Sequence, residues 1–302
     1  MTDLQTLSNQ LADAVEQAGR SIVAVNARRR RSASGIHWRP NLIVTVDHGI
    51  HREETVTVTL SDGETASAAI VGRDPATDLA VLRLETSLPT AQFADASQIK
   101  VGQIALAIAR NSDGATSASM GIVSAIINEG RDWHGGKVNQ LIRPSMMLYP
   151  GFSGSALVNT EGQVLGMNTT GARHMPVTVP IATVDRVVDQ LLQKGRIARG
   201  YLGLGMQAIR LPETLRQSLN LSNVGGVIVV SVEADAPADR AGVLIGDILI
   251  ALNGNAIDDV SDVHSILSSE QVGQPIAAQI IRGGALTEIT IVVGERSGRN
   301  CE

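Results

Sequence analysis

Two consecutive series of short, apolar, β-rich segments occupy the stretch from Ser32 to Ile181 and restrict the possible folds. The first series ends at about Leu84 and the second begins at about Gln103, and turn residues such as Asp62-Gly63 separate the segments. Helical patterns do not alternate with these strands, so parallel βαβ units are not expected. Two such series predict two small antiparallel barrels packed together.

Two segments with helical spacing flank these strands. Near the N-terminus, apolar residues recur at helical intervals at Leu4, Leu7, Leu11, Ala14 and Val15. After the second strand series, one helical face collects Val184, Val187, Val188, Leu191 and Leu192. Gly195 follows as a suitable C-terminal cap. We expect this second helix to close a first domain that spans residues 1–198.

The remaining residues, 199–302, have a different pattern. Several β-rich segments are present, and helical patterns lie near residues 236–241 and 260–268. This mix predicts a compact α+β module with a core of its own. The expected fold is therefore mainly β, with a double barrel followed by a small α+β barrel.

The composition argues against a nucleic-acid partner. The net charge is −5, and the chain has two residues each of Phe, Tyr and Trp on which bases could stack. The run from Arg28 to Arg31 could bind an anionic partner. In a net-acidic chain, however, a solvated loop between two strands is the favoured interpretation of this run.

The single cysteine and the N-terminus bear on the compartment. Cys301 has no partner for an intrachain disulfide. The first helix lacks the apolar core of a signal peptide, and no uncharged apolar run is long enough to span a bilayer. We therefore expect a cytoplasmic protein without a membrane span. A sequence lacking its export signal would look the same and would belong to the periplasm or another extracytoplasmic space.

The segment Tyr149-Pro150-Gly151-Phe152-Ser153-Gly154 is suited to nucleophilic catalysis. Glycines let the backbone turn tightly around Ser153, so that the N–H groups of Gly151 and Ser153 can converge beside its hydroxyl as an oxyanion hole. Gly-x-Ser-Gly alone is common in ordinary turns. The segment therefore needs a base and a carboxylate elsewhere in the chain.

Candidates for both lie in the first strand series. His48 follows the apolar segment LIVTV, which is a rigid position for a catalytic side chain, and Asp78 leads into LAVLRL. Asp74, before Pro75, fits a turn better. Taken singly, such a histidine is more often structural and such an aspartate is more often a cap. His48 and His51 form an H-x-x-H pair without a cluster that completes a metal site, so no metal is expected.

The chain order of these residues is more specific than any one of them. His48, Asp78 and Ser153 follow the chymotrypsin order. The rival α/β-hydrolase elbow requires Gly-x-Ser-x-Gly and the order Ser, acid, His. Here Ser155 replaces the final glycine, and alternating βα units are lacking. A chymotrypsin-like serine hydrolase is the favoured interpretation.

Five sequence blocks resemble those of the HtrA (Deg) proteases. Three surround the catalytic candidates, namely TVDHGI, TLSDGETASAAIVGRDPATDLAVLRL and PGFSGSALVNTEGQVLGMNT. Two more, ARGYLGLGMQ and VEADAPADRAGVLIGDILIALNG, are similar to that family's PDZ domain. The resemblance implies a chymotrypsin-like double barrel followed by one PDZ domain. It further implies His48 as general base, Asp78 as its orienting group, Ser153 as nucleophile, activity on unfolded or damaged proteins, homotrimers and no cofactor.

The chain departs from this family around the nucleophile. The family usually has Asn where this chain has Phe152, and Gly-Pro where it has Ser155-Ala156. The segment from Pro144 to Pro150 also differs. These departures predict an oxyanion hole that is not permanently formed. They also keep open a second function, a catalytically weak or inactive scaffold that binds peptide C-termini.

Two recognition surfaces are expected. The S1 pocket of the protease should be lined by Met147 at its base with Met167, Val177 and Val179, which favours Val, Leu, Ala or Met before the cleaved bond. Met147 could instead simply fill core. In the PDZ domain, a peptide C-terminus should meet the backbone of a carboxylate-binding loop and pair with an edge strand. The groove residues are Tyr201, Leu202, Gly203, Leu204, Met206, His264 and Leu267.

Overall fold

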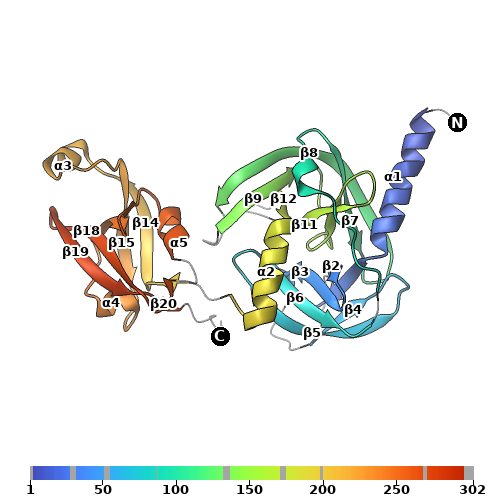
Figure 1. Ribbon diagram of the computed structural model, residues 1–302, viewed down its shortest axis with the longest axis horizontal. Helices are drawn as coiled ribbons and strands as arrows, with labels where there is room; N and C mark the ends of the chain where they lie inside the picture. Colours follow the sequence, from blue (N-terminus) through green and yellow to red (C-terminus); the bar gives the residue numbers. More distant parts are fainter. Residues whose placement is uncertain are drawn as a thin grey trace. The chain divides into compact units, whose positions relative to one another are not determined.

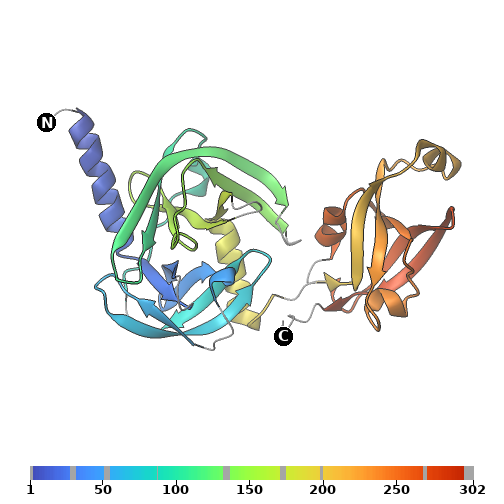
Figure 2. The same ribbon diagram turned by 180° about the vertical axis from the view of Figure 1, so that it is seen from behind.

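A computed structural model describes residues 3–27, 32–50, 55–86, 88–131, 137–170, 175–197, 200–267 and 271–295. The arginine run at 28–31, His51 and Cys301 lie outside these ranges. The chain divides into two compact units, 1–197 and 198–302, one residue from the boundary expected from the sequence. Figures 1 and 2 show the two units from opposite sides.

The first strand series forms a closed antiparallel barrel with the order β1-β2-β3-β6-β5-β4. Its strands are β1 (Ile22–Asn26), β2 (Ala33–Arg39), β3 (Leu42–Val46), β4 (Thr55–Thr59), β5 (Thr65–Asp74) and β6 (Leu79–Leu84). Every residue of β3 is buried, because this strand lies between β2 and β6. It ends in a short 3-10 turn, η1 (Asp47–Gly49). The barrel thereby gives His48 a rigid base.

The second strand series forms a second closed barrel with the order β10-β11-β12-β9-β8-β7. Its strands are β7 (Ile104–Arg110), β8 (Thr116–Arg131), β9 (Lys137–Pro144), β10 (Ala156–Val158), β11 (Val164–Thr170) and β12 (Pro176–Pro180), and the turn η2 (Ala96–Gln98) precedes them. One apolar cluster contains residues of both barrels, among them Ile43 of β3 and Met167 of β11. The predicted double barrel is confirmed.

Two helices flank the barrels, α1 (Asp3–Gly19) and α2 (Ile181–Lys194). The predicted apolar face of α2 is buried at Val184, Val187, Val188 and Leu191, whereas Leu192 is 38% exposed. Gly195 ends this helix with a left-handed φ of 69° and donates its N–H to the Leu191 carbonyl (2.8 Å). None of the described helices is both long and apolar enough to cross a membrane.

The second unit is a sheet with the order β14-β15-β16-β18-β19, to which β17 adds at β16, and a separate ladder of β13 with β20. The strands are β13 (Gly200–Tyr201), β14 (Leu204–Arg210), β15 (Gly225–Val232), β16 (Ile248–Leu252), β17 (Asn255–Ala256), β18 (Pro275–Arg282), β19 (Ala285–Val292) and β20 (Gly294–Glu295). The two predicted helices are α4 (Pro237–Arg240) and α5 (Val260–Ile266), and α3 (Glu213–Ser218) is an additional one. The unit has its own apolar core, which includes Val227, Leu252 and Ile280.

The second unit contains an ion pair between a buried carboxylate and a partly exposed arginine. Asp247 is 2% exposed and accepts hydrogen bonds from Nε (2.8 Å) and an amino nitrogen (2.7 Å) of Arg282. Burial by itself would raise the pKa of Asp247, but the bonds from Arg282 and from the Leu244 N–H outweigh it, so this pKa lies below its usual value. The carboxylate therefore remains charged in the folded unit.

Candidate active site

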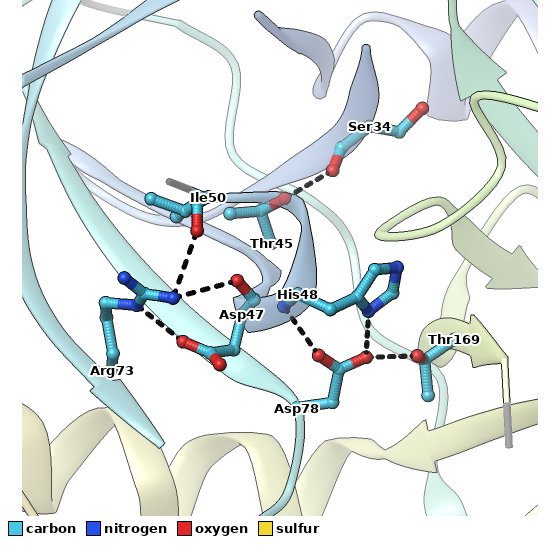
Figure 3. A network of polar contacts seen from close by, with 8 residues as sticks. All are labelled: Ser34, Thr45, Asp47, His48, Ile50, Arg73, Asp78 and Thr169. Atoms are coloured by element: carbon cyan, nitrogen blue, oxygen red, sulfur yellow. Dashed lines mark hydrogen bonds and ion pairs between the residues drawn. The ribbon is translucent and has the colours of Figure 1, made fainter. Parts of the chain in front are cut away.

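One carboxylate holds both the ring and the main chain of His48 (Figure 3). Nδ1 of His48 lies 2.7 Å from Oδ2 of Asp78, and the backbone N–H of His48 donates to Oδ1 (2.9 Å). Asp78 is 7% exposed, while the His48 side chain is 44% exposed. With Nδ1–H committed to the carboxylate, Nε2 of the neutral ring is the nitrogen that can accept a proton.

Asp78 takes its position from a tight turn before β6. It has a left-handed φ of 55°, a region that aspartate tolerates better than most residues. The turn is closed by Asp74, which accepts hydrogen bonds from the Thr77 hydroxyl (2.6 Å) and the Ala76 N–H (3.4 Å). Asp74 thus has the turn role expected for it, and Asp78 is left to face His48.

Thr169 of β11 also donates its hydroxyl to Oδ2 of Asp78. This contact crosses from the second barrel to the first, as Figure 3 shows. Sequence reasoning missed this role of Thr169, because a threonine in a strand carries no local sign of a partner that is 91 residues away. The carboxylate is therefore oriented from both barrels.

A second ion pair supports the turn that carries His48. Nε of Arg73 lies 2.5 Å from Oδ1 of Asp47, and an amino group of Arg73 donates to the carbonyls of Asp47 and Ile50 (3.1 Å each). Burial raises the pKa of Asp47, Arg73 offsets part of this rise, and the nearby Asp78 adds to it. Arg73 holds η1 on both sides of His48, which the sequence did not reveal.

The nucleophile loop is anchored by an apolar side chain. Phe152 is 3% exposed and packs among Val123, Ile142 and Leu157 in the core of the second barrel. Its ring also meets Tyr149 edge-on, with the centroids 6.0 Å apart. Phe152, at a position where the resembled family has a polar residue, therefore fixes this loop to the core of the second barrel.

Hydrogen bonds hold the carbonyl groups of this loop. The Gly151 carbonyl accepts from the Ser34 hydroxyl (2.8 Å), and the Phe152 carbonyl accepts from the Ser155 N–H (3.0 Å). The Ser153 carbonyl accepts from the Ser34 N–H (2.8 Å). Within the described part of the chain, by contrast, no backbone carbonyl accepts the N–H of Gly151 or of Ser153. These two N–H groups thus remain available for a ligand oxygen.

The loop closes against the first barrel at Gly154. Its φ is 82°, and a β-carbon there would lie 2.0 Å from the Ser34 carbonyl oxygen, so only glycine fits. Ser155, which stands where the resembled family has glycine, is fully buried and accepts a hydrogen bond from Nδ2 of Asn168 (2.9 Å). Both unusual residues beside Ser153 are thus accommodated by packing or hydrogen bonding.

Comparison with known proteins gives the family. Residues 33–167 match a trypsin-like peptidase domain and residues 200–293 match a PDZ domain. A solved HtrA-type protease, AlgW with a decapeptide, is 26% identical with a TM-score of 0.76, over 96% of this chain and 99% of that one. The serine endoprotease from Yersinia pestis is 28% identical with a TM-score of 0.75, over 96% and 98%. The chain is therefore a relative of the HtrA serine proteases, with a trypsin-like peptidase domain followed by one PDZ domain.

Curated relatives in this family are longer. A Serine protease Do-like HtrA from Lactobacillus helveticus is 34% identical over 80% of this chain and 62% of its own length. A probable periplasmic serine endoprotease DegP-like from Chlamydia pneumoniae is 32% identical over 84% and 52%. The chain therefore spans about half to three fifths of the length of these relatives.

The same comparison corrects the expected location. Matching relatives from Chlamydia and Brucella species are named periplasmic endoproteases. The expectation of a cytoplasmic protein is therefore wrong, and these HtrA relatives indicate an extracytoplasmic compartment. The sequence argument failed because its three signals, namely the N-terminal pattern, the single cysteine and the lack of a spanning apolar run, do not exclude export.

The residues expected to line the S1 pocket differ widely in solvent exposure. Met147, expected at the base of the pocket, is 68% exposed, which places its side chain at the surface. Met167, Val177 and Val179 are buried at 0%, 4% and 2% and belong to core clusters. Spacing from the nucleophile predicts a position along the chain, whereas the local path of segment 145–150 decides which side chains point inward.

The PDZ residues fall into two groups. Leu202 and Gly203 form the loop before β14, where their carbonyls accept the N–H groups of Ala238 and Glu233 (2.9 Å each). Tyr201, next to them, donates its hydroxyl to Glu233. Leu204 and Met206 lie on β14, which is an end strand of the sheet and contacts α5, the helix that carries His264. Leu267, expected to face the groove, is 7% exposed and belongs to the domain core.

A metal centre was sought among the same residues. In the ranges that the structure describes, no group of three or more His, Cys, Asp or Glu side chains is placed to hold a metal ion.

Proposed function

We propose that this chain is an endopeptidase in which Ser153, His48 and Asp78 form a catalytic triad. One observation carries the proposal. Asp78 holds His48 through two hydrogen bonds, and the loop with Ser153 leaves the N–H groups of Gly151 and Ser153 available. An available pair of backbone donors beside a serine is the arrangement that acyl transfer requires.

In this mechanism His48 Nε2 removes the proton from the Ser153 hydroxyl as its oxygen attacks the peptide carbonyl. The oxyanion of the tetrahedral intermediate accepts hydrogen bonds from the N–H groups of Gly151 and Ser153. His48 then gives its proton to the leaving amine, and a water molecule repeats the sequence on the acyl-enzyme. Asp78 stabilises the imidazolium that forms at each step and keeps Nδ1 as the protonated nitrogen of the neutral ring.

A fluorophosphonate probe tests this function directly, because only a serine beside a working base and oxyanion hole reacts quickly with it. We expect the chain to become labelled at Ser153 and to cleave casein. The Ser153→Ala variant should lose both activities, with a fall in kcat of several orders of magnitude at unchanged thermal stability. An unlabelled wild-type chain that still binds peptides would instead support the non-catalytic scaffold.

We further propose that the PDZ domain binds peptide C-termini and that this binding raises protease activity on unfolded proteins. The solved relatives AlgW with a decapeptide and AlgW with a tripeptide support a peptide ligand. In this chain β14 ends its sheet, so its outer edge offers main-chain groups to an added strand. A homotrimer is also proposed, by analogy with the family.

The PDZ proposal is tested with two peptides that share a hydrophobic last residue and differ in their end group. A free carboxylate can accept hydrogen bonds from backbone N–H groups of the loop at Leu202 and Gly203. We therefore expect the peptide with the free carboxylate to bind at least ten-fold more tightly than its amidated twin, which corresponds to about 1.4 kcal/mol in binding free energy. Calorimetric titration measures the affinities, and casein cleavage at saturation measures activation. Equal affinities for the two peptides would contradict recognition of the carboxylate by this loop. Tight binding without faster casein cleavage would contradict activation of the protease by peptide binding.

A further inference from the structure

Ser34 of β2 makes an unusual set of contacts with the nucleophile loop. It is fully buried, and its N–H, carbonyl and hydroxyl groups together take part in four hydrogen bonds to the residues named here. Its N–H donates to the Ser153 carbonyl (2.8 Å), its hydroxyl donates to the Gly151 carbonyl (2.8 Å), and its carbonyl accepts from the Thr45 hydroxyl (2.7 Å). The Ser34 hydroxyl oxygen also accepts the N–H of Arg110 (3.1 Å). One residue of the first barrel thus binds two carbonyls of the loop in the second barrel.

We propose that the Ser34 hydroxyl is a positioning group that holds Gly151 in the conformation in which its N–H serves the oxyanion hole. This inference rests on the proposed protease function. It adds a residue outside the triad and outside the oxyanion loop.

The hydroxyl is suited to this task because it uses its donor and an acceptor at once. It donates to Gly151 and accepts from Arg110, which is the last residue of β7. Arg110 is itself immobilised, since its guanidinium donates to the carbonyls of Gly19, Ile22 and Gly114 (2.5 Å each). Through Ser34, the Gly151 carbonyl is therefore tied to a rigid strand end.

Gly151 needs such a tie because packing does not fix it. A β-carbon at Gly151 would meet its nearest atom at 3.9 Å, so the space around it is open, in contrast to Gly154. Its φ of 95° lies in a region that glycine leaves easily. The plane of the 151–152 peptide is held at its carbonyl by Ser34 and at its N–H by the Tyr149 carbonyl (3.0 Å). Loss of the Ser34 hydrogen bond frees the Gly151 carbonyl. The 151–152 peptide can then rotate, and the Gly151 backbone adopts a wider range of orientations.

When the Gly151 N–H points in several directions, it stabilises the oxyanion less but has little effect on substrate binding. Removing one oxyanion donor outright costs about 10²–10³ in kcat. For Ser34→Ala, where the donor remains but is loosened, we expect a fall in kcat of about ten- to a hundred-fold and a change in KM of less than about three-fold.

The experiment compares Ser34→Ala and Ser34→Cys with the control Ser21→Ala. Cysteine fills nearly the same volume but is a weak donor and acceptor, so it separates hydrogen bonding from packing. Ser21 is 4% exposed and donates to a backbone carbonyl, that of Ala18 (2.9 Å), in the same barrel. Fluorophosphonate titration counts active sites, and then kcat, KM and the inhibition constant of a peptide boronate are measured per active site. The boronate forms a tetrahedral adduct that needs the same N–H donors.

We expect both Ser34 variants to lose boronate affinity in proportion to their loss of kcat, with Ser21→Ala close to wild type. If Ser34→Ala does not fold, Ser34→Cys alone decides. A Ser34→Cys variant with wild-type kcat and boronate affinity overturns the inference, because packing would then be the whole role of the side chain. Parallel losses in Ser21→Ala would also overturn it. A wild-type chain that takes up no fluorophosphonate would contradict the proposed function itself, which is a separate outcome.

Discussion

At the scale of single residues, the site depends on one buried carboxylate. Asp78 adopts a left-handed backbone conformation and accepts hydrogen bonds from the ring and the main chain of His48 and from Thr169. A buried charge is costly unless such partners surround it. The cost of burial is therefore offset by the same contacts that orient the base.

We expect Asp78→Asn to lower kcat by about 10⁴-fold, because an amide presents a donor to Nδ1 and favours the wrong imidazole tautomer. Thr169→Val removes one partner but leaves the carboxylate, so it should cost far less. Steady-state kinetics on a peptide substrate measures both, with thermal unfolding as a check on the fold. Similar losses in the two variants would mean that Asp78 acts only as a structural residue.

At the scale of elements, sequence periodicity located the strands and the order of the catalytic candidates. His48, Asp78 and Ser153 were singled out because each lies beside an apolar strand segment and because their order along the chain is the chymotrypsin order. The partners that position them were not predictable. Ser34 is 117 residues from Gly151, and Thr169 is 91 from Asp78, so only the closed barrels bring them together. The roles expected of Met147 and Leu267 stay predictions, because side-chain direction depends on packing that no short pattern encodes.

Phe152 offers a test of how the nucleophile loop is anchored. Phe152→Asn would restore the residue type usual in the resembled family, yet here it would bury an amide in an apolar core. We expect a loss of about 3–5 kcal/mol in the free energy of unfolding and slower fluorophosphonate labelling. Phe152→Leu keeps an apolar anchor and is the matched control. Asn and Leu variants of equal stability would show that the core does not hold the loop.

At the scale of the whole molecule, the chain is two units with separate cores. Each core is closed by contacts within its own unit, such as the Asp247–Arg282 pair in the second. Damage to one core should therefore leave the other largely unchanged.

Arg282→Gln tests this independence and carries a pH signature. The variant loses charge-assisted bonds to buried Asp247, so we expect the PDZ unit to be less stable than in the wild type at pH 7 while the unfolding of the protease unit is unchanged. Because the pKa of Asp247 is lowered on folding, its stabilisation is present above the unfolded pKa. The difference between variant and wild type should thus shrink as the pH falls below about 4. Calorimetry from pH 7 to pH 3 measures this, with the exposed Arg210→Gln as control. A difference that is constant with pH would contradict the argument.

The contact of Thr169 with Asp78 has a mechanical consequence. Asp78 and His48 lie on the first barrel, Ser153 belongs to the loop before β10 of the second, and the Thr169–Asp78 bond is one of the hydrogen bonds that join the two barrels. In the proposed mechanism, strain that separates the barrels breaks this bond and moves Ser153 away from His48 while each sheet is still intact. We therefore expect catalytic activity to be lost before either barrel unfolds.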